Sequence, residues 1–364
     1  MTLQQINLRE LSGLRGNGRD VLTAYFHGSH GLSKLTKQQR RIRDLLDDEL
    51  EQENFEASLS TLQSLIDDND LSGVEGVCAI SSALLDVCQM YPISMEVPNR
   101  MILGPAPYIR PLAELQDEYE TFLLIVCDND HTRILSITNE TAETESAIKG
   151  GVKNHVRKGG WSQQRYERRR DEQLGHYGDD VAGEVEKLVR ELKVNRIVLA
   201  GSDETMRAIE EQLSSQFAHM IVGREAFDLN RPEEELMEVA YEDYFAQERR
   251  EEKNLWMRIK DEALSDGRWC LGPRETLEAA KMGRVDTAIV TRDFRENVAK
   301  CRACEEIAAE MVNDCPSCKS DDVFAVDYVD TLARLLELSS ADVNFVDAIN
   351  GLTKAGHVAA LLRY

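Results

Sequence analysis

Four cysteines near the end of the chain place the strongest constraint on how it can fold. Cys301 and Cys304 form one CxxC pair, and Cys315 and Cys318 form a second pair after ten intervening residues. Two such knuckles can donate four thiolates to one tetrahedral zinc ion, which leaves no open position for catalysis. The spacing therefore predicts a structural zinc that stabilises an excursion too small to have its own core. A reduced cluster of free thiols or a redox pair is the alternative.

The rest of the composition is that of an ordinary globular protein with room for two or three domains. The other cysteines are scattered among apolar residues and are predicted to be small buried side chains: Cys78, Cys88, Cys127 and Cys270. No N-terminal run combines positive charge with an apolar stretch, and apolar strings such as FLLIVC at 122–127 are too short to span a membrane. We expect a cytoplasmic protein with no membrane partner.

A basic segment at residues 149–170 stands out from an acidic chain. It holds eight Lys or Arg residues and one acidic residue, whereas the formal net charge of the whole chain is −23. The two glycines at 159–160 allow a tip thin enough to enter a narrow site. Behind them, Arg165, Arg168 and Arg169 share one face of a predicted helix. This pattern predicts local, salt-sensitive binding of nucleic-acid phosphate. A solvated helix behind a loop is the alternative.

The spacing of strands, helices and turns divides the chain into three predicted α/β domains, at residues 1–116, 117–231 and 232–364. In the first, VLTAYF is an expected strand, and residues 34–68 have the apolar spacing of one or two amphipathic helices. We interpret GVCAISSALLDVCQM as a strand and the proline-rich stretch 91–111 as an irregular passage. Five basic residues are equally compatible with RNA contact and with a solvated face: Lys34, Lys37, Arg40, Arg41 and Arg43.

Strand and helix patterns alternate in the second and third domains, which predicts a mixed α/β fold with a partly parallel sheet. A hairpin is expected at 119–138, around the turn Asp128-Asn129-Asp130. A helix cap is expected at Asn230, with Pro232 in the first turn of the helix that follows. Further helices are expected at 181–192, 206–213, 273–282 and 327–338, and further strands at 196–201, 219–223, 285–290, 342–346 and 358–364.

Several strings resemble the archaeal and eukaryotic class-1 release factors and the related rescue factor Pelota, with distant bacterial homologues that include hibernation factors of the Balon type. HVRKGGWSQQRYERRR and GHYGDDVAGEV resemble the segment that carries a Gly-Gly-Gln tip and a basic helix. TLEAAKMGRVDTAIV, the paired knuckles and GHVAALLRY resemble the closing domain. The resemblance implies a three-domain release-factor-like architecture with a decoding-region-like first domain, a tip-bearing middle domain and a GTPase-binding last domain with a zinc-binding excursion.

Two departures from the release-factor pattern bear on activity. Release factors place glutamine directly after the two glycines, where it helps to position water for hydrolysis of the peptidyl-tRNA ester, but this chain has Trp161 there. An indole has one N–H donor and no acceptor that could orient water. Gln163 lies two residues further on, and such a displacement can cost orders of magnitude in rate. The NIKS string, linked to stop-codon reading, is also absent. We therefore expect no enzymatic activity and no catalytic residue.

What the resemblance then implies is a factor that occupies the ribosomal A site without hydrolysis, as in ribosome hibernation under stress. Expected partners are 16S and 23S rRNA, with P-site tRNA as a further candidate, and a translational GTPase, in bacteria elongation factor Tu. Trp161 either stacks on an unpaired base or packs against its own domain. The candidate rRNA-binding residues are Lys153, His155, Arg157, Lys158, Gly159, Gly160, Trp161, Ser162, Gln163, Gln164, Arg165, Arg168, Arg169 and Arg170.

Three other functions stay open at this point. The first is a peptidyl-tRNA hydrolase, for release or rescue, that uses Gln163 in a rearranged tip. The second is a Pelota-like adaptor that recruits a GTPase to stalled ribosomes and promotes subunit splitting. The third is a general RNA-binding protein.

Overall fold

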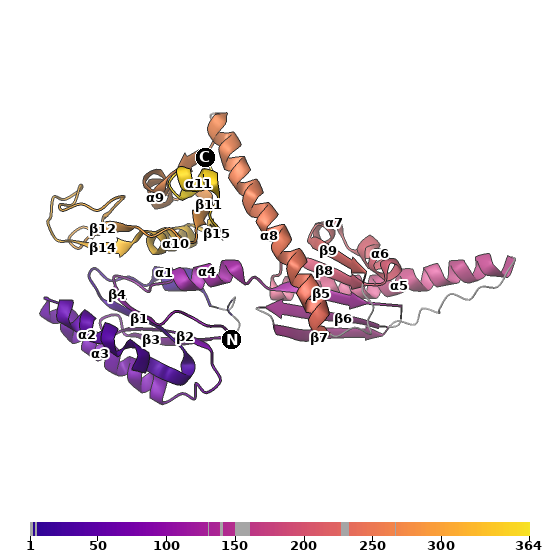
Figure 1. Cartoon of the computed structure of the whole chain (residues 1–364), viewed down its shortest axis with the longest axis horizontal. Coiled ribbons are helices and arrows are strands. Elements are labelled where there is room, and N and C mark those ends of the chain that lie inside the picture. Colours follow the sequence, from indigo (N-terminus) through magenta and orange to yellow (C-terminus); the bar gives the residue numbers. More distant parts are fainter. Residues whose placement is uncertain are drawn as a thin grey trace. The chain divides into compact units, whose positions relative to one another are not determined.

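The computed structural model describes residues 3, 6–129, 131–138, 141–149, 161–226, 233–265 and 267–364. Its elements form two compact units (Figure 1), one made of Met1–Glu118 with Asn254–Tyr364 and the other of Tyr119–Lys253. The first unit therefore combines the beginning and the end of the chain. The boundary between the units falls inside the long helix α8, Glu233–Leu264.

The beginning of the chain folds into an antiparallel sheet with strand order β3-β2-β1-β4. Helix α3 begins at a cap, because the Asp48 carboxylate accepts a hydrogen bond from the backbone N–H of Glu51 at 2.9 Å. Phe55, Leu62 and Ile66 recur at helical spacing and enter the core beside the sheet. The elements are α1 (Leu8–Gly13), β1 (Val21–Phe26), η2 (Gly28–Leu35), α2 (Thr36–Leu45), α3 (Glu49–Asp67), β2 (Gly76–Ser82), β3 (Val87–Ile93), β4 (Arg100–Gly104) and α4 (Arg110–Glu118).

Two expectations for this part of the chain are wrong. Residues 76–90 are not one strand, because β2 and β3 form a hairpin that turns at Asp86, whose φ is +52°. Neither glycine nor proline marks that turn, so the apolar run reads as continuous. The stretch 91–111 is not irregular throughout, because it contains β4 and the first turn of α4, where Pro111 needs no hydrogen-bonded N–H. The strand at 21–26 and the two helices within 34–68 are confirmed.

The middle of the chain forms a five-stranded sheet with order β7-β6-β5-β8-β9. β5, β8 and β9 are parallel to each other, while β6 and β7 continue the sheet antiparallel. The predicted hairpin and the partly parallel sheet are therefore confirmed. The elements are β5 (Phe122–Cys127), β6 (His131–Thr138), β7 (Thr141–Lys149), α5 (Trp161–Leu192), β8 (Ile197–Gly201), α6 (Asp203–Gln212), α7 (Ser215–Ala218) and β9 (Ile221–Ala226).

Strand β5 explains why this sheet has helices on both faces. Side chains alternate along a strand, so Leu123 and Ile125 join the core that contains α5 and α6, while Phe122 and Leu124 join the core that contains Tyr244 of α8. All six residues of the strand are buried. A continuous apolar run such as FLLIVC is the expected sequence of a strand covered on both faces.

Helix α5 is longer than the helix expected at 181–192. It begins at Trp161 and continues through Gly175 and Gly178 without interruption. Gly178 lies where α5 meets α6, and a Cβ atom at this position would lie 2.5 Å from the Ala208 carbonyl oxygen. The glycine therefore permits close helix packing here and does not end the helix.

The end of the chain forms a sheet with order β10-β16-β11-β15, in which only β11 and β15 are parallel. Ile259 of α8 packs into its core with Ile289 and Leu352. A separate small sheet, β13-β12-β14, carries the cysteine pairs. The elements are β10 (Trp269–Leu271), α9 (Pro273–Lys281), β11 (Val285–Thr291), β12 (Asn297–Cys301), β13 (Ile307–Ala308), β14 (Val323–Asp327), α10 (Tyr328–Ser339), β15 (Asp342–Val346), α11 (Asn350–Lys354) and β16 (Val358–Leu362).

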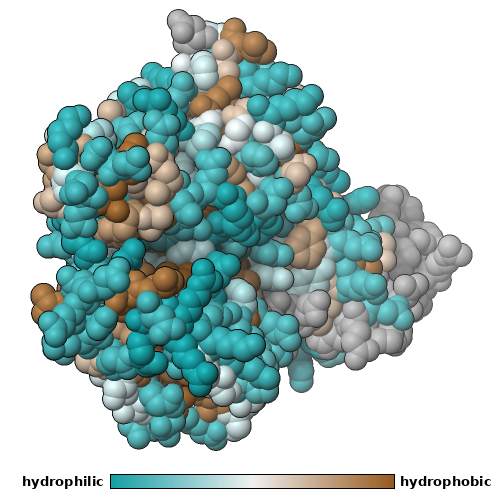
Figure 2. Space-filling model, turned by 60° about the vertical axis from the view of Figure 1, so that its left-hand side comes forward, coloured by the Kyte–Doolittle hydropathy of each residue, from teal (hydrophilic) through white to brown (hydrophobic). Residues whose placement is uncertain are grey.

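The mixed α/β fold class is confirmed, while the three-domain division stays a prediction. Each predicted domain contains a sheet, although the compact units combine the first and last segments. The expected Asn230 cap, Pro232 and Asp130 lie outside the described residues. Among the described residues, no helix combines the length and apolar character needed to cross a membrane. Figure 2 shows mostly hydrophilic residues on the face that it displays, with hydrophobic residues in scattered patches.

Candidate functional site

The basic helix α5 is anchored by its second half. Leu174, Tyr177, Val181 and Val185 recur at helical spacing and are buried in the core against the sheet. The Tyr177 hydroxyl also shares a hydrogen bond of 2.7 Å with the Thr132 hydroxyl of β6. Figure 1 shows the first turns of α5 projecting beyond the sheet to which its second half is fixed. The fold of this unit therefore presents the beginning of α5 away from its own core.

Three consecutive arginines in the first half of α5 differ in what surrounds them. Arg168 and Arg169 are exposed. The side chain of Arg170 is only 13% exposed and forms an ion pair with Glu204 of α6. Its hydrogen bond to that carboxylate raises the pKa of the Arg170 guanidinium. Arg168 and Arg169 are thus available to an external phosphate, whereas Arg170 already has an acidic partner in the chain.

The other candidate rRNA-binding residues lie wholly or partly outside the described part of the chain. Lys153, His155, Arg157, Lys158, Gly159 and Gly160 lie outside the described residues. Trp161, Ser162, Gln163, Gln164 and Arg165 have described backbone, which is helical, but their side chains lie outside the description. The helix predicted behind the glycines is therefore present, and its contacts with RNA stay a prediction.

The five basic residues of the first domain were compatible with RNA contact or with a solvated face, and the structure separates them into two groups. Lys34, Lys37, Arg40 and Arg41 are exposed along η2 and α2. Arg43 instead donates from Nη2 to the Glu56 carboxylate of α3 at 2.9 Å. For Arg43 the geometry favours the solvated face with an acidic partner further along the chain.

The four candidate metal ligands gather in one place. The sulfur atoms of Cys301, Cys304, Cys315 and Cys318 lie within 4.8 Å of one another. Cys301 Sγ is 3.5 Å from Cys318 Sγ, and Cys304 Sγ is 3.5 Å from Cys315 Sγ. Tetrahedral thiolate ligands around zinc at about 2.3 Å have similar sulfur separations. The four cysteines can therefore hold a metal ion, and all four are free of disulfides.

The two cysteine knuckles repeat the same backbone geometry. The N–H of Glu305 donates to the Cys301 carbonyl at 3.0 Å, and the N–H of Lys319 donates to the Cys315 carbonyl at 2.9 Å. Glu305 and Lys319 have nearly equal positive φ angles, +61° and +63°. The backbone N–H of Cys318, and to a smaller extent that of Ser317, lowers the pKa of the Cys315 thiol to about 6. The lowered pKa favours the thiolate form of Cys315, and the four convergent sulfurs fit a closed metal centre.

Among the remaining cysteines, the prediction of burial holds for three. Cys78, Cys127 and Cys270 are buried, and Cys88 is half-buried. Burial raises the pKa of the Cys78 and Cys127 thiols to about 12. These thiols are therefore poor nucleophiles and poor metal ligands.

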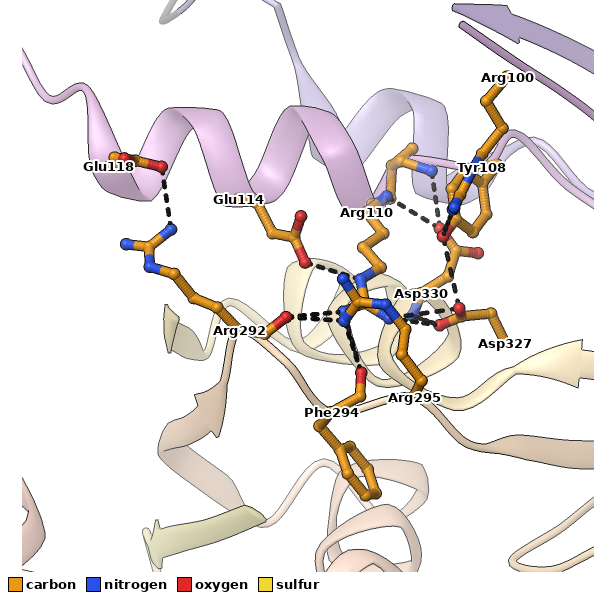
Figure 3. Close-up of polar contacts among 11 residues, drawn as sticks. Arg100, Tyr108, Arg110, Glu114, Glu118, Arg292, Phe294, Arg295, Asp327 and Asp330 are labelled. Atoms are coloured by element: carbon orange, nitrogen blue, oxygen red, sulfur yellow. Dashed lines mark hydrogen bonds and ion pairs between the residues drawn. The ribbon is translucent and has the colours of Figure 1, made fainter. Parts of the chain in front are cut away.

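A polar network that no local sequence pattern indicates fixes α4 to the last part of the chain (Figure 3). Arg110 has a side chain only 3% exposed and forms ion pairs with Glu114 and, 3.3 Å away, Asp327. Its Nη2 also donates to the Phe294 carbonyl at 3.0 Å. The partners lie up to 217 residues away in the sequence, and no local pattern could have indicated them.

Asp330 occupies the buried side of the same network. Its carboxylate accepts hydrogen bonds from the backbone N–H groups of Ile109 at 2.7 Å and Arg110 at 3.0 Å. Burial raises the pKa of the Asp330 carboxyl to about 7, against the opposing effect of the Arg334 charge. The first unit therefore contains a carboxyl group whose charge changes near neutral pH.

Comparison with known proteins places the chain close to one group. The family model described as bacterial archaeo-eukaryotic release factor family 10 matches residues 107–243. Peptide chain release factor subunit 1 of Methanocaldococcus jannaschii is 24% identical over 404 aligned residues, which cover 98% of this chain and 96% of the relative. The same factor of Archaeoglobus fulgidus is 24% identical over 393 residues, with the same coverage.

Solved structures of the same group show weaker overall likeness. Archaeal Pelota, in a model of ribosome-bound Pelota and ABCE1, has a TM-score of 0.45 and 17% identity, covering 79% of this chain and 77% of that chain. Dom34 of S. cerevisiae has a TM-score of 0.42 and 11% identity, covering 79% of this chain and 80% of that chain. Because these TM-scores are low, the similarity that matters for function is the one in sequence.

Proposed function

We propose that this chain, which belongs to the family of archaeo-eukaryotic release factors and Pelota-like proteins, binds the ribosomal A site without hydrolysing peptidyl-tRNA. It is a translation factor of a family whose named relatives are peptide chain release factors. The physiological role that follows is ribosome hibernation, in which the factor occupies idle ribosomes in the cytoplasm. The expected contacts are 16S and 23S rRNA, with P-site tRNA as a further candidate.

The single observation that carries this proposal is the combination of a retained basic helix with a changed tip. Arg168 and Arg169 are exposed in the first half of α5, where they can contact RNA phosphate. Trp161 stands where a release factor needs glutamine, and Gln163 lies inside the helix, two residues beyond the position that follows the glycines. We therefore expect binding to rRNA without hydrolysis, because the glutamine amide that positions water in release factors is absent at position 161.

The metal that we propose for the four cysteines is zinc. Four thiolates in tetrahedral arrangement are the donor set of structural zinc centres, and they leave no position for a reacting water. Cys301, Cys304, Cys315 and Cys318 would hold it and thereby fix the knuckles between β12 and β14. Zinc here would have a structural role only.

The proposed protein partner is a translational GTPase, bound through the last segment of the chain. This part of the proposal rests on the resemblance of residues 276–290 and 356–364 to the closing domain of the family. In bacteria the candidate is elongation factor Tu. Gel filtration of the two purified proteins with GTP tests it, and absence of a complex with this or any other translational GTPase would remove the partner from the account.

A second candidate is a Pelota-like rescue adaptor. Loss of both the NIKS string and the glutamine after the glycines agrees equally well with a factor that recruits a GTPase and promotes subunit splitting. The two functions differ in what happens to intact ribosomes. A hibernation factor leaves them assembled, whereas a rescue adaptor with its GTPase increases the free subunits in a sucrose gradient.

Sedimentation tests the binding step directly. Purified protein is mixed with vacant ribosomes at low salt and pelleted through a sucrose cushion. We expect stoichiometric co-sedimentation that weakens as salt rises, because phosphate contacts release counterions. Protein that stays in the supernatant at low salt would contradict the proposed function.

A further inference from the structure

A cationic cavity lies in the first unit, between β4, the small sheet that carries the cysteines, and α10. Its volume is about 440 Å³, and its lining includes Arg15, Arg100, Lys300, Phe324 and Arg334. Cavities of about 300–1,000 Å³ with an apolar wall and a few convergent polar groups are typical ligand sites. We propose that this cavity binds a small phosphorylated organic molecule of the nucleotide class.

The positive charge in the cavity is only partly used by the protein itself. Lys300 is 7% exposed and, among the described residues, donates one hydrogen bond, to the Gly16 carbonyl at 3.3 Å, although an ammonium group has three donors. Arg334 donates from Nη2 to the Ser12 carbonyl at 3.1 Å, and its buried Nε has no hydrogen-bond partner in the described part of the chain. Unsatisfied buried donors of this kind are costly unless a ligand accepts from them.

Neighbouring cations add to this excess. Arg15 lines the cavity, is exposed, and forms no ion pair within the described part of the chain. Burial lowers the pKa of the Arg334 guanidinium, and the nearby charge of Arg15 acts in the same direction, while Asp330 opposes them. Arg19 also lines the cavity and shares the carboxylate of Glu51 with Arg302, so one acid serves two bases. Like charges held this close favour an anionic ligand.

The acidic groups of the lining compensate these cations only in part. Asp327 pairs with Arg110, and Asp330 accepts from two backbone N–H groups, as Figure 3 shows. Glu305 lies in the first cysteine knuckle and is exposed. Five bases and three acids line the cavity of a chain whose net charge is −23. The cavity is therefore a local positive site on an acidic protein.

The chemistry of the lining selects phosphate with an organic part. Guanidinium groups match phosphate oxygens in a bidentate geometry, and several uncompensated cations suit a ligand with more than one negative charge. Ile102, Leu103, Leu335 and Leu338 supply an apolar wall for the rest of the molecule. The sequence has no glycine-rich phosphate loop, so recognition would rest on these side chains.

Calorimetric titration of the purified full chain, without ribosomes, tests this proposal. The probes are GDP, ADP, inorganic pyrophosphate and unphosphorylated guanosine. We expect saturable binding of at least one nucleotide, weaker binding of pyrophosphate because it misses the apolar wall, and no binding of guanosine. Arg15→Gln should raise the dissociation constant roughly tenfold, the usual loss for one charge-assisted hydrogen bond. Because Arg15 is exposed and forms no ion pair with any described residue, this variant should fold normally.

Two further variants make the result specific. Arg274→Gln removes an exposed charge on α9, outside the cavity, and should leave the dissociation constant unchanged. Arg334→Gln should weaken binding at least as much as Arg15→Gln, with thermal unfolding as the check on folding. Absence of saturable binding for both nucleotides at millimolar concentration would overturn the proposal. So would binding that Arg15→Gln leaves unchanged, or Arg15-dependent binding of a short RNA with none of GDP or ADP.

Discussion

Two regions carry candidate functional side chains: the first half of α5, and the cysteine hairpin formed by residues 297–327. The cysteines of the hairpin face one another, whereas the arginines of α5 face outward to a proposed RNA partner. In the hairpin, the four sulfurs lie within 4.8 Å of one another, so the chain itself brings the candidate metal ligands together. On α5, Arg168 and Arg169 are exposed beyond the core that anchors the helix. Changes in the hairpin should therefore alter stability, and changes of the α5 arginines should alter binding.

The largest effect is expected on removing the zinc proposed for the four cysteines. Chelation, or Cys315→Ser, should unfold the hairpin locally, because structural zinc supplies most of the folding free energy of such small units. Hydrogen exchange should then accelerate across 297–327 and stay slow in β5. Metal analysis of the untreated protein should find zinc. Cys88→Ser, a half-buried cysteine outside the hairpin, is the matched control and should change neither measurement. If the protein contains no metal, or if chelation leaves hydrogen exchange across 297–327 unchanged, the proposed structural role of zinc is contradicted.

The next effect concerns the network that holds α4 against the end of the chain. Arg110→Met should lower the free energy of unfolding by about 3–5 kcal/mol, because Asp327 and the Phe294 carbonyl lose a buried partner. Urea denaturation measures the change. Arg274→Met removes an exposed arginine of the same unit and should change stability by less than about 0.5 kcal/mol. Equal urea midpoints for the two variants would mean that the network does not hold the unit together.

Asp330 makes the stability of the same region depend on pH. The pKa of Asp330 in the folded chain, about 7, is above the usual value of an unfolded aspartate, about 4, so the folded state retains the proton longer. Its contribution to stability is therefore complete below pH 4 and is lost as pH rises to 7. The slope is at most about 1.4 kcal/mol per pH unit. Asp330→Asn should flatten the profile between these limits. Parallel profiles for the two proteins in urea denaturation would contradict the assignment.

The smallest effect is expected on the α5 side of the comparison. Arg168→Gln with Arg169→Gln should weaken ribosome binding roughly tenfold and leave the urea midpoint unchanged, because both side chains are exposed. The salt dependence of binding should also fall, by about 0.7–0.9 per lost phosphate contact. Lys187→Gln removes a 56% exposed charge near the other end of the same helix and should have neither effect. Equal losses of binding in both variants would indicate non-specific attraction.

These two regions also differ in how far the sequence predicts them. Local sequence predicts the candidate metal site, because each CxxC pair forms its own turn and the two pairs are close in sequence. It predicts β5 as well, because the apolar run of this strand shows burial on both faces. The full length of α5 is not predictable from local sequence, because Gly178 is explained only by its close tertiary contact with α6.

Long-range contacts were not predictable in the same way. Arg110 and Asp327 each look like ordinary surface residues in their local sequence, and only the meeting of α4 with α10 buries them. The cationic cavity combines Arg15, Arg100 and Lys300, which lie in three distant segments. The hairpin turn at Asp86 was missed for a local reason, since a non-glycine residue there adopts a positive φ.

The central claim is that the chain binds ribosomes and spares the ester bond of peptidyl-tRNA. Ribosomes carrying a labelled peptidyl-tRNA, incubated with the purified protein, test both parts in one experiment when sedimentation and release of the label are measured together. The account predicts co-sedimentation with no release above background, for the natural chain and for Gln163→Ala alike. Release of the label that Gln163→Ala abolishes would contradict it, and would identify the displaced glutamine as catalytic.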